Sequence, residues 1–145
     1  MTSLKKFLKD KGYTRIKLVR TKTNHFEMDA CINGVDGTFI LDTGASSTCI
    51  GTDCAEKFRL ISEASDIRAA GAGASNMLTE ISRKNTVEIG NWSQKKIKLV
   101  LFDLTHVNQA LVNHDAKPVN GIIGADILKR GKAVIDYEKK ALYLK

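Results

Sequence analysis

The run of residues 39–50 constrains the fold more than any other part of the chain. Three apolar residues, Phe39–Leu41, lead directly into Asp42, Thr43 and Gly44. A short apolar run of this kind predicts a buried strand, and a glycine permits the tight turn that would follow it. A carboxylate at the end of a buried strand is costly unless it has a partner. The sequence therefore predicts a strand, a tight turn, and an acid that needs a second polar group.

Alternating polar and apolar residues around this run predict a largely β structure. Residues 26–32 alternate, and the pairs Asn33-Gly34 and Asp36-Gly37 supply turn signals before a strand over residues 38–41. Further strands are expected over residues 16–19, 86–89, 96–102, 133–137 and 141–144. Short helices are expected over residues 4–12 and 125–130, a helical turn within 53–58, and loop with some helix over 104–117.

The bulk composition indicates one globular domain. With 145 residues and 43% hydrophobic content, the chain is long enough to bury its own core. Its apolar runs are all far shorter than the roughly 20 residues that span a bilayer, and its N-terminal residues do not form a signal peptide. Three cysteines without a secretion signal argue against a disulfide framework. These features predict a cytoplasmic protein without a membrane span. The sequence has no Cys/His cluster with the spacing of metal ligands, so we expect no metal site.

The positive charge is confined to the first part of the chain. Residues 1–23 hold eight Lys or Arg against Asp10 alone, which accounts for the whole net charge of +7. We therefore divide the chain into a basic N-terminal extension, residues 1–23, and a neutral domain, residues 24–145. The extension is either a solvated face or a segment that binds nucleic acid or an anionic surface.

Two motifs resemble a known family. Residues 39–46 resemble the catalytic motif of aspartic proteases, and residues 122–128 resemble its second hallmark, two hydrophobic residues and a glycine before a short helix. The resemblance implies that this glycine, Gly124, lies beneath the catalytic turn. Their order and spacing are similar to those of a single retropepsin-like subunit, over roughly residues 24–145. The resemblance implies an all-β fold: a closed retropepsin-type barrel with one or two short helices and one lobe per chain.

The same resemblance implies a homodimer. The chain has one Asp-Thr-Gly, so the partner of Asp42 would be Asp42 of a second copy, on a twofold axis. Two close carboxylates share one proton, so that one can activate a water while the other hydrogen-bonds the scissile carbonyl. The implied activity is that of an aspartic endopeptidase with an acidic pH optimum and no cofactor. The alternative is a catalytically silent module of the same fold that dimerises or binds peptides.

Supporting roles follow from position in the resembling motifs. Thr43 would bond across the dimer, Gly44 would let the backbone approach the substrate, and Ala45 would contact it. Gly71, Ala72 and Gly73 occupy the place of a flap tip that closes over a bound peptide. The other interpretation of these three residues is a phosphate-binding loop.

The remaining polar residues are assigned structural roles. A phosphate-binding loop at the predicted flap tip would need a third glycine where the chain has Asn76. Asp126 is expected to cap a helix. The three histidines are scattered along the chain and predict no nucleophilic triad.

Overall fold

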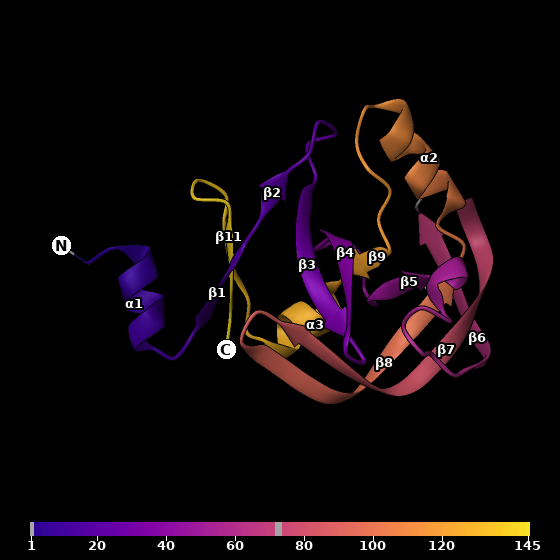
Figure 1. Cartoon of the computed structure of the whole chain (residues 1–145), viewed down its shortest axis with the longest axis horizontal. Coiled ribbons are helices and arrows are strands. Elements are labelled where there is room, and N and C mark those ends of the chain that lie inside the picture. The colour runs from indigo at the N-terminus through magenta and orange to yellow at the C-terminus, as the bar shows by residue number, and fades with distance from the viewer. Residues whose placement is uncertain (1, 72–73) are drawn as a thin grey trace.

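The computed structural model describes residues 2–71 and 74–145, with side chains described outside residues 64–78. The strands are β1 (Thr14–Lys17), β2 (Val19–Arg20), β3 (Phe26–Ile32), β4 (Val35–Leu41), β5 (Cys49–Gly51), β6 (Ser62–Gly71), β7 (Ala74–Ile89), β8 (Trp92–Phe102), β9 (Gly121–Ile123), β10 (Val134–Asp136) and β11 (Ala141–Leu144). The helices are α1 (Leu4–Asp10), α2 (Thr105–Asn113) and α3 (Ala125–Arg130), with a 3-10 turn over Thr52–Cys54 (Figure 1).

Six of these strands close into a barrel. Their order around the ring is β3, β4, β9, β5, β8 and β7. The ring closes where Cys31 and Ile32 of β3 pair with Glu88 and Val87 of β7. Strands β2 and β6 extend the sheet beyond this ring. The predicted all-β barrel is confirmed.

A smaller sheet joins the two ends of the chain. Its order is β1, β11, β10, and β1 pairs antiparallel with β11 from Thr14 opposite Leu144 to Lys17 opposite Ala141. Figure 1 shows both strands on the side of the barrel where α1 lies. Ile16 and Leu18 are buried in the main core. The second half of the basic segment is therefore packed against the body of the protein.

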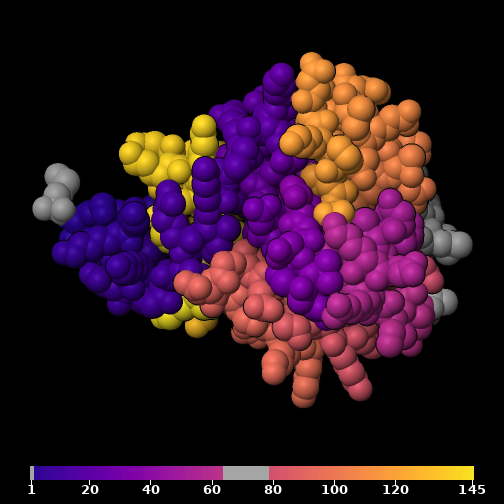
Figure 2. Space-filling view, in the orientation of Figure 1, coloured from indigo at the N-terminus to yellow at the C-terminus, as the bar shows by residue number. Residues whose placement is uncertain are grey.

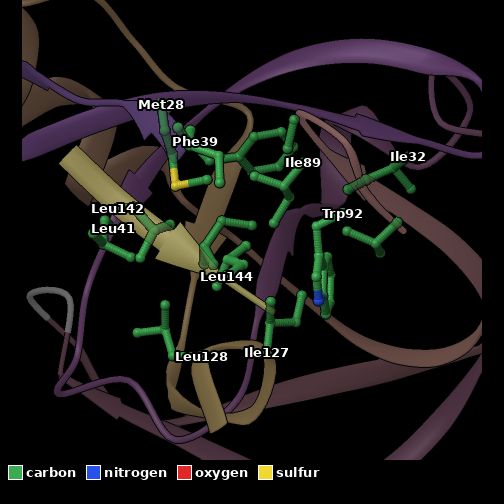
Figure 3. Close-up of a cluster of buried hydrophobic side chains, with 14 of the residues drawn as sticks. Met28, Ile32, Phe39, Leu41, Ile89, Trp92, Ile127, Leu128, Leu142 and Leu144 are labelled. Carbon is green, nitrogen blue, oxygen red and sulfur yellow. The ribbon is translucent and has the colours of Figure 1, made fainter. Parts of the chain in front are cut away.

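The main core forms where alternating strands turn their apolar side chains inward. In β3 every second residue from Phe26 to Ile32 is buried, which is the periodicity of a half-buried strand. Figure 3 shows side chains from β3, β4, α3 and β11 converging with Trp92 on one cluster. This core fixes the ends of β4 and α3, which carry the two recognised motifs.

Two local predictions need correction. Asn33-Gly34 is the turn between β3 and β4, as expected, but Asp36-Gly37 lies inside β4. A Cβ at Gly37 would lie 2.6 Å from Cζ of Phe58, so packing space and not a turn explains this glycine. Within residues 104–117, where the sequence predicted loop with some helix, residues 105–113 form helix α2, so the helical part is longer than expected. Among the described helices, none is long and apolar enough to span a membrane.

Candidate active site

Asp42 lies at the end of β4, beside the end of β9. These two strands run parallel, and Leu41 is opposite Ile123. The backbone N–H of Asp42 donates to the carbonyl oxygen of Ile123 at 3.0 Å. The Asp42 Oδ1 atom accepts from the Gly44 N–H at 2.9 Å. This arrangement holds an exposed carboxylate on a tight turn at the end of a buried strand pair.

Gly124 lies directly against this turn, as the resemblance implied. The Ala125 N–H donates to the carbonyl oxygen of Ala45 at 2.7 Å. A Cβ at Gly124 would lie 2.7 Å from that same oxygen and 2.9 Å from the carbonyl of Ser47. Backbone therefore occupies the space that any side chain at position 124 would need. The glycine allows the two motifs to touch.

A buried threonine that the sequence did not single out connects the two motifs. Thr48 is fully buried, and its Oγ1 accepts from the Gly124 N–H at 3.0 Å. The same hydroxyl donates to Asp126 Oδ1 at 2.7 Å, which also accepts from the Ile127 N–H at 2.8 Å. Asp126 was expected to cap this helix. The N-cap position is held by Gly124, and Asp126 lies in the first turn of α3, where its carboxylate accepts these two hydrogen bonds.

A cavity of about 500 Å³ opens beside Asp42. Its lining combines residues before β3, at the ends of β4 and β9, and along α2: Thr23, His25, Ile40, Asp42, His106, Val107, Ala110, Leu111, His114 and Ile122. Figure 2 shows the chain before β3 (purple) and the α2 segment (orange) next to each other on the surface. The cavity is large enough for an extended peptide's side chain, and the aspartate stands on its wall.

All three histidines of the chain line this cavity, which the sequence did not predict. The Nδ1 of His25 shares a hydrogen bond of 2.7 Å with the Thr23 hydroxyl. The Nδ1 of His114 lies 2.8 Å from the carbonyl oxygen of Ala110, so this nitrogen carries the proton and donates. The sequence carried no signal for this grouping, because it depends on α2 folding back over β4 and β9.

The other predicted site residues lie in different surroundings. Thr43 is exposed and faces a second hollow, which is lined by α3 and β10. Ala45 is half-buried and packs against the apolar cluster beneath the cavity. Gly71 ends β6, opposite Ala74 of β7. The remaining predicted flap residues, Ala72 and Gly73, lie outside the described residues.

Cys49 is a buried thiol in the segment that follows the turn at Asp42. Burial raises the pKa of its thiol to about 12, and the negative charges of Asp126 and Asp42 add to that rise. Its Sγ donates to the carbonyl oxygen of Ser47 at 3.2 Å. The thiol therefore stays protonated and acts as a small apolar group. Across the described part of the chain, no cluster of His, Cys, Asp and Glu is arranged to hold a metal.

Solved structures share this architecture. A retropepsin-like aspartic protease from Rickettsia conorii superimposes with a TM-score of 0.62 and 24% identity, over 91% of this chain and 89% of that one. The EIAV protease in complex with an inhibitor superimposes with a TM-score of 0.52 and 20% identity, over 71% of this chain and 84% of that one. The retroviral protease-like domain of Ddi1 from Leishmania major superimposes with a TM-score of 0.50 and 19% identity, over 90% of this chain and 88% of that one. The fold is therefore that of the retropepsin-like proteases.

Sequence comparison leads to the same group. DNA damage-inducible protein 1 from Phaeosphaeria nodorum is 28% identical over 136 residues, which cover 92% of this chain and 28% of that protein. The chain thus spans little more than a quarter of that relative's length. Residues 28–127, which include the first motif and all but the last residue of the second, match the aspartyl protease family. The chain belongs to the aspartyl protease family and has the retropepsin-like fold.

Proposed function

We propose that the protein is a homodimeric aspartic endopeptidase in which Asp42 pairs with Asp42 of a second copy. The observation that carries this proposal is the position of Asp42, exposed on the wall of a cavity and held on a turn by Ile123 and Gly44. An acid used only to cap a turn would not need a neighbouring cavity. Membership of the aspartyl protease family supports the same activity.

The chemistry requires the two carboxylates to differ in protonation. Like charges at close range disfavour double ionisation, so the pair holds one proton and titrates as a unit. The ionised carboxylate takes a proton from a water, which attacks the carbonyl carbon of the peptide bond. The protonated carboxyl hydrogen-bonds the carbonyl oxygen and later gives its proton to the leaving nitrogen. The products are a free carboxylate and a free amine, with no covalent intermediate.

The second copy is argued from the surface around the turn. The chain supplies one Asp-Thr-Gly, and the side chains of Asp42 and Thr43 are both exposed. The hollow beside Thr43 is walled by Leu128 of α3 and Ile135 of β10, which gives a second subunit apolar surface to cover. In this arrangement the Thr43 hydroxyls would bond across the twofold axis. Gly44 would leave backbone room for the substrate.

The remaining assignments concern the substrate. We assign Ala45 to the substrate-facing side of the turn, and the tip of the β6–β7 hairpin, residues 71–73, to a flap over the peptide. The backbone pairing of Gly71 with Ala74 supports a hairpin that ends at this tip. A flap would exclude water from the reacting bond and bring substrate contacts from above.

A peptide-library assay tests the activity. Purified wild type and Asp42→Asn are incubated with a mixed peptide library from pH 3 to pH 8, and cleaved bonds are identified by mass spectrometry. We expect cleavage by the wild type in an acidic, bell-shaped profile, because one carboxylate must be ionised and the other protonated. Cleavage that persists in Asp42→Asn would remove Asp42 from the mechanism. The absence of cleavage by a dimeric wild type would favour the silent binding module.

A subunit-mixing experiment tests the shared site. Equal amounts of wild type and Asp42→Asn are unfolded together and refolded, so that subunits combine at random. About one quarter of the dimers then carry two intact aspartates, and activity per wild-type subunit should fall to about half. If activity per wild-type subunit does not change on mixing, one Asp42 per dimer is sufficient. Sedimentation at the assay concentration confirms that the refolded protein is dimeric.

A further inference from the structure

We propose that the cavity beside Asp42 is a subsite for an acidic side chain of the substrate, recognised by His25, His106 and His114. This inference rests on the proposed peptidase function and gives it a substrate class. The subsite would take the residue next to the cleaved bond, because Asp42 lines the same cavity. Glutamate is the residue that we expect it to accept best.

The grouping of histidines is specific to this cavity. The chain has three histidines, and all of them line it, although they come from two separate segments. His25 precedes β3, whereas His106 and His114 stand at the beginning and just beyond the end of α2. Asp42 is the one other ionisable residue in the lining. A substrate side chain in this cavity therefore meets imidazoles on more than one side.

The shape of the cavity suits a long side chain with a charged end. Ile40, Leu111 and Ile122 form an apolar floor and belong to one buried cluster with Cys49. The methylene groups of a glutamate can contact that floor, while its carboxylate reaches the more exposed imidazoles. Apolar surface with a few placed polar groups is the common construction of specific binding sites.

The hydrogen bonds of two histidines engage one nitrogen of each ring. Nδ1 of His114 donates to the Ala110 carbonyl, and Nδ1 of His25 is bonded to the Thr23 hydroxyl. Within the described residues, this leaves Nε2 of each ring for a substrate group. A protonated imidazole donates from Nε2, and a carboxylate only accepts, so their hydrogen bonds would be charge-assisted.

One acid outside the cavity lining, Asp103, interacts with a histidine of this group. The pKa of Asp103 is lowered mainly by its hydrogen bonds to Thr105. The nearby imidazole of His106 makes a smaller contribution in the same direction. Asp103 is already bonded to the Thr105 N–H at 2.8 Å. Histidine charge generally changes between about pH 5 and 8, and peptide glutamates are ionised above about pH 4.5. The comparison of glutamate with glutamine is therefore made at pH 5.5, where the glutamate carboxylate is ionised.

Matched substrates and variants test the subsite through cleavage. Each library bond cut by the wild type is remade as four peptides with Glu, Gln, Leu or Lys at each position flanking the bond. We expect kcat/KM to be about tenfold higher for Glu than for Gln at pH 5.5 at one of these positions. The variant with His25→Asn, His106→Asn and His114→Asn should bring that ratio close to one. An asparagine at 114 can keep the short-range hydrogen bond to Ala110 while removing Nε2.

A binding measurement separates this proposal from the peptidase proposal. The wild-type protein has three imidazole Cε1–H signals, which are followed by NMR during titration with N-acetyl-glutamate N-methylamide at pH 5.5 and pH 8. We expect at least two signals to shift at pH 5.5, with much smaller shifts for the matching glutamine compound. Shifts without any peptide cleavage would overturn the peptidase function and leave the acidic subsite in place. Cleavage without a preference for Glu over Gln, or equal shifts with both compounds, would overturn the subsite.

Discussion

Thr48 and Asp126 are joined by a hydrogen bond of 2.7 Å, although they lie 78 positions apart in the sequence. Thr48 donates to the carboxylate and accepts from the Gly124 N–H with the same hydroxyl. One buried side chain therefore connects the loop after Asp42 with the start of α3. This connection fixes the distance between the segment that contains Asp42 and the start of α3. The geometry of the turn at Asp42 depends on it.

Replacing Thr48 tests this connection. Thr48→Val keeps the shape but leaves the Gly124 N–H and the Asp126 carboxylate without this partner, so we expect a loss of about 1–3 kcal/mol in the free energy of unfolding. The measurement is urea denaturation followed by circular dichroism. Thr48→Ser, which keeps the hydroxyl, should recover most of the loss. Equal losses in the two variants would show that packing of the Thr48 methyl is what matters.

Gly124→Ala should displace the catalytic turn. The added Cβ would overlap the Ala45 carbonyl at 2.7 Å, and backbone cannot yield as a flexible side chain can. We expect a loss of about 1–3 kcal/mol in stability and a fall in kcat/KM of about 100-fold. Gly34→Ala is the control, since nothing lies within 4 Å of its Cβ and only its φ of +83° is strained.

Gly34→Ala should lose about 1–2 kcal/mol in stability and keep its kcat. Similar losses of kcat in the two variants would mean that general destabilisation, and not the position of the turn, lowers the activity. Both variants are assayed at a temperature where circular dichroism shows them to be folded.

Glu27 should make stability depend on pH. It lies opposite Ile40 in the β3–β4 pair, and its Oε1 is buried with no hydrogen-bond partner among the described residues. Burial raises the pKa of Glu27, against the opposing charge of Lys117. A raised native pKa means that the proton is bound more tightly in the folded state, so the stabilisation is present at acidic pH. It is lost as the pH rises through the native pKa.

Glu27→Gln removes this titration while keeping the shape of the side chain. We expect its urea midpoint to exceed that of the wild type at pH 7 and to match it at pH 3.5, where the wild-type carboxyl is protonated. Asp36→Asn, which neutralises an exposed acid on the neighbouring strand β4, is the control. The same midpoint difference at both pH values would rule out an ionised Glu27 as the cause.

Cys49 should be the least reactive of the three thiols. Burial raises the pKa of Cys49 to about 12, so its thiolate is scarce at pH 8. Cys31 and Cys54, in contrast, are only partly buried. With a chromogenic disulfide reagent at pH 8, we expect two faster phases and one much slower phase. In 6 M guanidinium the three thiols should react together. Cys49→Ala should remove only the slow phase, and loss of a faster phase instead would reverse the assignment.

The basic segment needs a test that leaves the fold intact. Deleting residues 1–23 would remove β1 and the buried Ile16 and Leu18, so a loss of binding after that deletion would not identify a charged surface. Substitution of Lys5, Lys6 and Lys9 on α1 by glutamine avoids this problem. If the segment is a solvated face, neither protein should bind a 30-nucleotide single strand at 150 mM salt. Binding that weakens with salt and disappears in the variant would establish an anion-binding surface.

Local patterns in the sequence predicted the elements that position Asp42. The strand before it, the turn at Asn33-Gly34, the helix over residues 125–130 and the final hairpin depend on neighbouring residues, whose periodicity is visible in the sequence. The turn predicted at Asp36-Gly37 was wrong because Gly37 makes room for Phe58, a contact between distant segments. The resemblance also placed Gly124 against the turn correctly.

The surroundings of Asp42 could not be predicted in the same way. Thr48 is an ordinary threonine until its hydroxyl meets Gly124 and Asp126, and the three histidines become a group only when α2 covers the ends of β4 and β9. Helix α2 has only a short apolar stripe, Val107, Ala110 and Leu111, and it begins just after Asp103, which accepts a hydrogen bond from the Thr105 N–H. Side-chain contacts across the fold decide these features, and periodicity does not record them.

The parallel pairing of β4 with β9 also has a consequence for how the protein folds. Residues 39–41 meet residues 121–123 only after a loop of about 80 residues has closed, and such distant contacts slow folding. Until then Asp42 has no Ile123 carbonyl to hold its backbone. A chain in which these strands have not paired therefore carries Asp42 without this support, and the site proposed for peptide hydrolysis is complete only after they pair.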